Sequence, residues 1–243
     1  MGSRQLWVTD HIEFRGGAAL RPNVKGPMME QLVHFHDHFL YNTLATDLYT
    51  NTNAGTSDEL IVSAAVGGQC RFKTGTGNSE TMMLCTSLNW EDDMYARCEA
   101  RIKLATVANT HMFFGFADAT TYATPITPID YDGGTVANGA TTAAGFVCDA
   151  DYESSSILCD GVGATVADSG IDWADGVWHN LRMELFPDAY ANYYIDGVSV
   201  ARVEDAIAVS GTALCMMLCV STRDTGGKYV YLDRWDAWQN QGE

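Results

Sequence analysis

Three histidines in close alternation are the densest group of potential metal ligands in the chain: His34, His36 and His38. Side chains two residues apart point to the same face of a strand, and neutral imidazole is a common ligand of transition metals. The alternative is that the neighbouring Phe35 and Phe39 fill a core while the histidines meet solvent or a partner subunit. The sequence alone therefore assigns no metal ligand.

Other reactive patterns are absent from the sequence or incomplete. No Gly-x-Ser-x-Gly nucleophile elbow occurs, and the segment Gly75–Asn78 has neither the lysine nor the helix of a phosphate-binding loop. The seven cysteines form no Cys-x-x-Cys pair and lie mostly in apolar runs, where a cysteine behaves as a small buried hydrophobe. We therefore predict no catalytic residue, no cofactor, and reduced thiols in the core.

The charge balance of the chain argues against nucleic acids as partners. The chain has 14 Lys and Arg against 31 Asp and Glu, a net charge of −17. Nucleic-acid binding needs a concentrated basic patch, and the basic alternation Arg97, Arg101 and Lys103 includes Glu99 among its members. No run approaches the ~20 apolar residues of a membrane helix. We predict no nucleic-acid and no membrane partner, and the lack of a signal-peptide run predicts synthesis in the cytoplasm.

The elements that must position these groups are strands. Short segments rich in β-branched and aromatic residues alternate with turns that contain Gly and Asp. Asp196-Gly197 is the clearest hairpin signal, because this pair favours the positive φ angles of a type I′ turn. Many short strands with regular turns indicate a sandwich or barrel. The predicted strands are Glu59–Val66, Gln69–Lys73, Glu80–Leu84, Met94–Leu104, His111–Ala117, Ala144–Cys148, Ser156–Cys159, Trp178–Phe186, Asn192–Ile195, Val198–Val203, Ala213–Val220 and Tyr229–Trp238.

Two segments fall outside this strand pattern. Residues 1–30 are broken by Gly and Pro and are predicted to form an extended N-terminal arm, which leaves residues 31–243 as one sandwich domain. The segment Thr120–Thr142 is rich in Thr, Ala, Gly and Pro. It is predicted to be a long surface loop between two strands, and loops of this length often carry function.

The C-terminal half resembles a known superfamily. Its order is a Trp178-His179 strand, a Tyr194-Ile195-Asp196-Gly197 hairpin, the strand Leu214–Val220 and a last strand with Tyr231–Trp235. This order resembles the concanavalin A-like lectin/glucanase superfamily, and within it the laminin-G-like jelly rolls, over roughly residues 80–238. The resemblance implies an all-β, two-sheet antiparallel jelly-roll sandwich, and its motifs mark the fold more than an activity.

The glucanases of this superfamily use paired carboxylates on one strand, spaced Glu-x-Asp-x-x-Glu or Glu-x-Asp-x-Glu, to flank the glycosidic bond. Glu91-Asp92-Asp93 has the wrong spacing, and Asp149–Glu153 has alternating carboxylates in a different order. Since the resemblance comes without this motif, we predict that the chain is not an enzyme.

The lectins of this superfamily bind sugars through aromatic stacking beside Asp and Asn, often with calcium. The resemblance makes Trp173 and Tyr190 candidate stacking platforms, with Asp151 and Asp175 as candidate polar partners. The alternative is that the aspartates form turns and that Trp178 and other tryptophans are core or interface residues. A carbohydrate-binding module is therefore the second predicted function.

A second resemblance is to the virion proteins of tailed bacteriophages. It rests on the irregular N-terminal arm, the Phe-His-Asp-His-Phe opening at Phe35–Phe39 and the Thr/Gly-rich loops. It implies a non-enzymatic structural protein, such as a capsid decoration, head-fibre or tail component, made in the host cytoplasm and located in the virion. The implied partners are other virion proteins, such as the major capsid or tail protein, and copies of the chain itself, with a trimer expected by analogy.

The N-terminal arm is predicted to make this attachment. An arm of this length cannot bury its apolar side chains in a core of its own, and a partner surface would cover them. The predicted partner-binding residues are Leu6, Trp7, Val8, Ile12, Phe14, Met28, Met29, Phe35 and Phe39.

Overall fold

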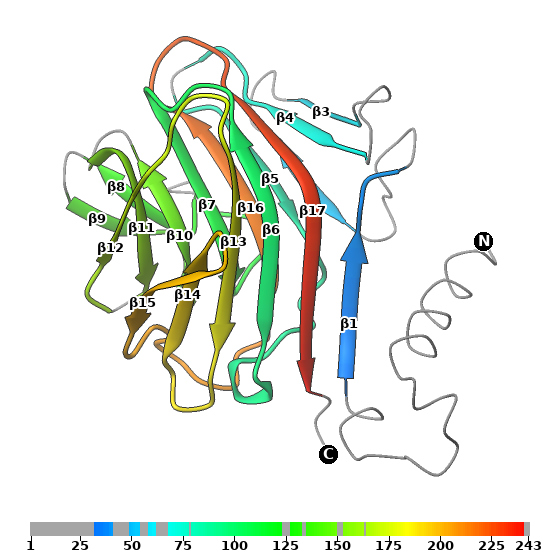
Figure 1. The fold of residues 1–243 in the computed structure, drawn as a ribbon, viewed down its shortest axis with the longest axis vertical. Coiled ribbons are helices and arrows are strands. Elements are labelled where there is room, and N and C mark those ends of the chain that lie inside the picture. Colours follow the sequence, from blue (N-terminus) through cyan, green and yellow to red (C-terminus); the bar gives the residue numbers. More distant parts are fainter. Residues whose placement is uncertain are drawn as a thin grey trace. The chain divides into compact units, whose positions relative to one another are not determined.

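Two antiparallel sheets lie one behind the other in a computed structural model of the chain (Figure 1). The structure describes residues 32–40, 49–53, 58–61, 68–77, 79–122, 127–132, 135–149, 153–162 and 164–240. Over these residues there is one 3-10 helix, Asp92–Met94, and no α-helix. His34–Gln239 forms one compact unit. The predicted all-β, two-sheet jelly-roll sandwich is confirmed for the described residues.

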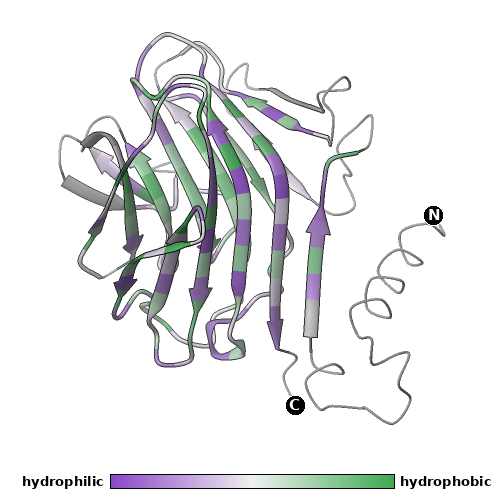
Figure 2. Cartoon of the chain, viewed as in Figure 1, coloured by the Kyte–Doolittle hydropathy of each residue, from purple (hydrophilic) through white to green (hydrophobic). Residues whose placement is uncertain are grey.

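Sheet A carries a buried and an open face. Its strands are β1 (Leu32–Asp37), β3 (Asp58–Ile61), β4 (Cys70–Lys73), β6 (Arg97–Leu104), β13 (Trp178–Leu185), β14 (Ala191–Ile195), β15 (Val198–Val203) and β17 (Tyr229–Asn240). They follow the order β15-β14-β13-β6-β17-β4-β3, and β1 pairs with β17 beside this path. Buried and half-buried residues alternate along β6 and β13, as a strand with one covered face requires. Figure 2 shows the matching alternation of hydrophilic and hydrophobic bands.

The central strands of sheet B are covered on both faces. Its strands are β2 (Thr50–Asn53), β5 (Thr81–Cys85), β7 (Thr110–Ala117), β10 (Ala143–Asp149), β11 (Glu153–Gly161), β12 (Ala167–Asp172) and β16 (Cys215–Thr222). They follow the order β12-β11-β10-β7-β16-β5-β2. Every residue of β7, β10 and β16 is buried. These strands are therefore near-continuous apolar runs in the sequence, without the alternation seen in sheet A.

The main core fills the space between the two sheets. Large aromatic side chains from both sheets meet there, and Phe114 of β7 lies 6.3 Å from Trp235 of β17 between ring centroids. Phe114 also stacks on Phe146 at 6.4 Å, and Phe146 meets Tyr193 edge-on at 5.1 Å. All four side chains are fully buried. Such aromatic contacts add about 0.5–1.5 kcal/mol each to the free energy gained from burying the rings.

A second core covers the outer face of sheet B. The strands β8 (Ile129–Asp132) and β9 (Thr135–Asn138) form a separate two-stranded sheet. Ile129 and Tyr131 of β8 are fully buried in one cluster with Phe113, Val147 and Met217 of sheet B. The prediction that Thr120–Thr142 is a surface loop was therefore wrong at these strands. An exposed apolar face on sheet B would be unstable in water, and the hairpin covers it.

The turn between β14 and β15 forms as predicted. Asp196 and Gly197 have φ angles of 51° and 83°, the pair of positive values that a type I′ turn needs. By contrast, the predicted strand Met94–Leu104 begins only at Arg97. The 3-10 helix occupies the preceding residues, and Tyr95 after it adopts a left-handed φ of 53°.

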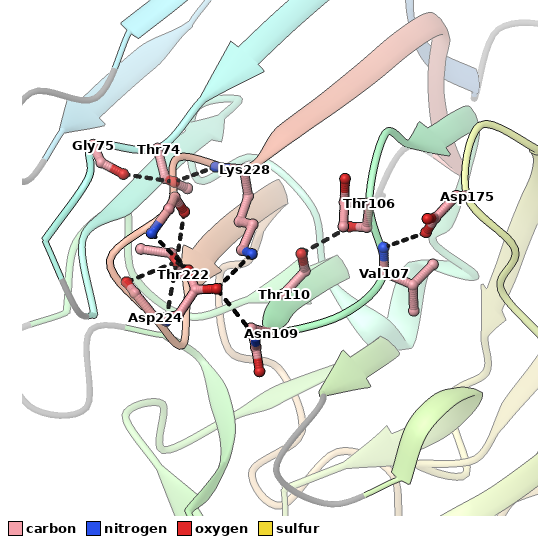
Figure 3. A network of polar contacts seen from close by, with 11 residues as sticks. Thr74, Gly75, Thr106, Val107, Asn109, Thr110, Asp175, Thr222, Asp224 and Lys228 are labelled. Carbon is pink, nitrogen blue, oxygen red and sulfur yellow. Dashed lines mark hydrogen bonds and ion pairs between the residues drawn. The ribbon is translucent and has the colours of Figure 1, made fainter.

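The connections after β4, β6 and β16 are tied together by side-chain hydrogen bonds (Figure 3). The Oδ2 atom of Asp224 accepts hydrogen bonds from Asn109 at 3.1 Å and Lys228 at 3.0 Å, and Gly226 donates its backbone N–H to Oδ1 at 2.8 Å. These hydrogen bonds, that of Gly226 first, hold the pKa of Asp224 well below its usual range. Lys228 also donates its backbone N–H to Thr74 at 2.9 Å. This end of the sandwich is therefore a fixed polar network.

Candidate functional site

The open face of sheet A gathers polar, charged and aromatic side chains in registered rows. Alternation along β6 and β13 turns Arg97, Glu99, Arg101, Lys103, Trp178, Asn180, Arg182 and Glu184 outward. Neighbouring strands add Arg71, Lys73, Tyr194, Tyr229, Tyr231, Arg234, Asp236 and Trp238. We call these residues the sheet A face.

The strand register sets which of these side chains are neighbours. Glu99 lies directly opposite Arg182 of β13 on one side and Asp236 of β17 on the other. Two rows further along, Lys103 lies between Trp178 and Tyr231 in the same way. Opposite residues in an antiparallel pair have Cβ atoms about 4.5–5.5 Å apart, so each row is a line of touching side chains.

Cations lie over the aromatic rings of the sheet A face. The guanidinium of Arg97 is 3.9 Å from the centroid of the Trp238 ring, and that of Arg182 is 3.8 Å from the Tyr194 ring. The ammonium of Lys103 is 4.7 Å from the Trp178 ring and 4.3 Å from the Tyr231 ring. Since a cation is attracted to the face of an aromatic ring, these contacts fix the orientation of both groups.

Ion pairs connect the rows. Glu184 pairs with Arg97 and with Arg182, each at 3.4 Å. Glu99 pairs with Arg97 at 3.3 Å and with Arg234, and Arg234 in turn pairs with Asp236 through Nε and Oδ2 at 3.1 Å. Burial and the neighbouring Arg182 lower the pKa of Arg97 despite its acidic partners. The face is thus a preorganised network of charge-assisted contacts.

The histidine cluster lies at the β1 edge of this face. Nδ1 of His36 hydrogen-bonds Oδ1 of Asp236, and Nε2 of His34 lies 3.7 Å from the same oxygen. Burial would raise the pKa of Asp236, but hydrogen bonds from His34 and His36 hold it well below its usual range. His38 is exposed, and its ring meets that of His36 edge-on at 4.2 Å. The structure therefore joins two of the three predicted histidines to an aspartate that the sequence did not suggest.

A second acidic cluster is buried beneath the β8–β9 hairpin. Arg223 pairs with Asp130 and with Asp149, and its Nε donates to Oδ1 of Asp149 at 3.2 Å. His111 lies beside them, with Nε2 3.7 Å from Asp149 and 2.9 Å from the carbonyl oxygen of Ile129. Because the guanidinium of Arg223 already bonds both carboxylates, it supplies the positive charge that this cluster needs.

His111 should make the fold sensitive to mild acid. Its burial lowers its pKa against the raising effect of Asp149. Below about pH 6.5 the histidine of the unfolded chain binds a proton, whereas the folded His111 stays neutral to lower pH. Because the unfolded state then binds more protons, the free energy of unfolding falls as the pH decreases. The fall is at most about 1.4 kcal/mol per pH unit. We expect His111→Gln to lose less stability than the wild type between about pH 7.5 and about pH 5.5. Urea unfolding at the two pH values measures this, and equal losses would contradict it.

The predicted glycan-binding residues do not present a stacking surface. Trp173 is only 3% exposed and its ring packs edge-on against His179, so it offers no face to a sugar. Asp175 accepts a hydrogen bond from the backbone N–H of Val107 at 2.7 Å and holds the loop after β6 (Figure 3). Tyr190 is half-buried and stacks on Phe186 at 4.4 Å. Asp151 lies outside the described residues.

The predicted partner-binding residues divide in two. Leu6, Trp7, Val8, Ile12, Phe14, Met28 and Met29 lie outside the described residues, as does the boundary at residue 30. Phe39 is 1% exposed and belongs to the main core, and Phe35 packs against that core. These two side chains therefore fill the core, which is the alternative that the sequence left open.

The structure also bears on the cysteines and on membrane-spanning helices. All seven cysteines are buried, as their apolar surroundings predicted. Among the described residues no helix is long and apolar enough to cross a bilayer.

Comparison with known proteins gives matches of fold only. No known protein family and no curated protein sequence matches the chain. Among solved structures, the laminarinase from Flavobacterium sp. UMI-01 has a TM-score of 0.60 at 12% identity, covering 86% of this chain and 100% of that chain. LamA from Z. galactanivorans, in complex with laminaritriose and laminaritetraose, has a TM-score of 0.59 at 10% identity, covering 86% and 98%. The β-glucanase of Bacillus licheniformis has a TM-score of 0.56 at 13% identity, covering 86% and 98%.

These neighbours correct one prediction and leave others untested. The prediction that the chain is not an enzyme is contradicted, because its structural neighbours include several glucanases. The virion location and the virion partners remain predictions from the sequence, since these neighbours give no link to a phage. The predicted fold is supported: the chain shares the two-sheet jelly-roll fold of these glucanases and laminarinases.

Proposed function

We propose that the chain binds a polysaccharide on the sheet A face. The observation that carries this proposal is the row arrangement itself: aromatic rings, guanidinium groups and carboxylates alternate across β13, β6 and β17 on one open face. A sugar ring offers an apolar C–H face and a rim of hydroxyl groups. An aromatic side chain can pack against the first, and charged side chains form strong hydrogen bonds with the second.

The charge of this face narrows the choice of probe. Half of the chain's 14 basic residues lie on it, namely Arg71, Lys73, Arg97, Arg101, Lys103, Arg182 and Arg234. With its three acidic residues the face has a formal net charge of 7 − 3 = +4, so the rest of the chain carries −21 of the total of −17. An acidic polysaccharide would be attracted to this face, while the neighbours named above support a neutral β-glucan. Both kinds of polysaccharide belong in the test.

Trp178→Ala is expected to weaken polysaccharide binding about tenfold, which is about 1.4 kcal/mol. Trp178 is a large ring at the end of one row, and aromatic anchors of this kind dominate binding surfaces. Affinity for laminarin, as the neutral probe, and for alginate, as the acidic probe, is measured by affinity electrophoresis and calorimetry. Tyr231→Ala should give a similar loss, because Tyr231 lies in the same row, on the other side of Lys103.

Tyr95→Ala is the matched control. Tyr95 is 53% exposed and lies before β6, so its loss removes an aromatic ring outside the sheet A face. The proposal would be contradicted if Trp178→Ala, Tyr231→Ala and Tyr95→Ala bound the probes with equal affinity. It would also be contradicted if the wild type bound neither probe. The far-ultraviolet circular dichroism of each variant shows whether it is folded.

The same incubations test for cleavage of the glycan. Glu99 and Asp236 lie opposite each other, so their Cβ atoms are about 5 Å apart, and Arg234 pairs with both carboxylates. Reducing ends released by the wild type and lost in Glu99→Gln would add glycoside hydrolysis to binding. Asp236 is unsuited to be the general acid of such a reaction, because its pKa is held well below its usual range.

A further inference from the structure

We propose that His34, His36 and Asp236 bind a transition-metal ion, with zinc(II) as the best match. The potential ligand atoms of these three residues all lie within 4.8 Å of one another. Tetrahedral zinc with bonds of about 2.0–2.2 Å holds its ligand atoms about 3.4 Å apart. The distance of 3.7 Å from Nε2 of His34 to Oδ1 of Asp236 already approaches that value.

The fold builds this arrangement from both ends of the described chain. Alternation along β1 puts His34 and His36 on one face, and β1 pairs with β17, which carries Asp236. His36 and Asp236 are 200 residues apart in the sequence. All three side chains are shielded from solvent, with exposed side-chain fractions between 12% and 15%. A bound ion would therefore be partly desolvated, and few water molecules would compete with the protein ligands.

The surroundings of the three ligands orient them. Arg234 pairs with Oδ2 of Asp236 at 3.1 Å, so Asp236 would offer the metal only Oδ1. Arg234 also pairs with Glu99, which offsets its positive charge next to the ion. The ring of Trp238 packs edge-on against His34 at 5.9 Å between centroids. Contacts of this kind around metal ligands fix their geometry and raise affinity.

The donor atoms select the class of metal. Two imidazole nitrogens and one carboxylate oxygen suit zinc and other late divalent ions of the first transition row. Calcium and magnesium take oxygen ligands almost alone, so this set disfavours both. The buried cluster of His111, Asp130 and Asp149 offers the same types of atom, but there the guanidinium of Arg223 bonds both carboxylates.

A metal bound at this site would fix β1 to β17. Because the ion would bind the folded state and not the unfolded chain, it would stabilise the sandwich as its concentration rises. This inference rests on the cluster alone and does not depend on polysaccharide binding.

The test is a titration of the chelator-treated protein with zinc chloride, followed by calorimetry. Cobalt(II) replaces zinc in a parallel titration, and its visible absorption reports the coordination geometry of the bound ion. We expect one ion per chain. His36→Gln and Asp236→Asn should each weaken the binding at least tenfold, since even changes beyond the ligands themselves cost about 10–100-fold. Zinc should raise the melting temperature of the wild type and leave that of both variants unchanged.

Two matched controls lie on the same segments. His38→Gln removes a neighbouring histidine, and Asp233→Asn removes a carboxylate of β17 that pairs with Arg101 instead. Both should bind zinc as the wild type does. The proposal is overturned if the wild type binds no zinc, or if His38→Gln loses as much affinity as His36→Gln, because nonspecific chelation by a histidine-rich strand would then explain the binding.

Discussion

Gly115→Ala should destabilise the sandwich by about 3 kcal/mol or more, at the upper end of the range for overpacked cores. A Cβ atom at this position would lie 2.1 Å from the carbonyl oxygen of Ala144 and 2.5 Å from the Cα atom of Gly145. Both atoms belong to the backbone of β10, the strand paired with β7 at this point. Neither can move without separating the two strands. Urea unfolding followed by tryptophan fluorescence measures the loss.

Gly170→Ala is the control for this prediction. Gly170 has a φ of +70° and nothing within 4 Å of its added Cβ, so its substitution carries only the conformational cost of about 1 kcal/mol. If Gly115→Ala were no more destabilising than this control, the close approach of β7 and β10 would not be a constraint on the sequence.

The second large effect is expected at Arg223. Arg223→Met should cost about 3–5 kcal/mol, because it leaves two buried carboxylates without their cation. The Asp149 side chain is fully buried, and Asp130 is 7% exposed.

Arg202→Met is the matched control for Arg223→Met. Arg202 pairs with Glu204, but both side chains are more than half exposed, and exposed pairs contribute about 0–1 kcal/mol. The measurement is urea unfolding of both variants at neutral pH. A loss below about 1 kcal/mol in Arg223→Met would mean that water enters the cluster and solvates the carboxylates.

The alternation of buried and outward-facing residues explains why the strands of sheet A were easier to predict than those of sheet B. In β13 the period of two identifies the strand and also its outward residues, because one face meets the core and the other meets water. The strands β7, β10 and β16 are recognisable only as apolar runs, since both of their faces are covered. The β8–β9 hairpin was missed because the segment around it, Thr120–Thr142, is rich in Thr, Ala, Gly and Pro, and its packing is decided by the apolar face that it covers.

The candidate sites depend on contacts that no local pattern reveals. Arg223 meets Asp149 from 74 residues away and Asp130 from 93. Asp236 follows an irregularity in the pairing of β17 with β6, between Leu232 and Arg234. This shift changes which residues of β17 face outward, and simple alternation from Tyr229 would have turned Asp236 inward. The alternating histidines were the one signal of the metal cluster in the sequence, and they indicated His34 and His36 but not Asp236.

The strand order also has a consequence for how the chain comes together. The two strands latest in the sequence are not at the edges: β16 lies between β7 and β5, and β17 pairs with β6 and β4. Until residues 215–240 leave the ribosome, sheet B remains as two pieces and sheet A as three, since β1 also pairs with β17. A nascent chain that stops before β16 would therefore leave unpaired edges on β1, β4, β5, β6 and β7, which can pair with other chains. A chaperone or fast completion of synthesis would be needed to keep it from aggregating.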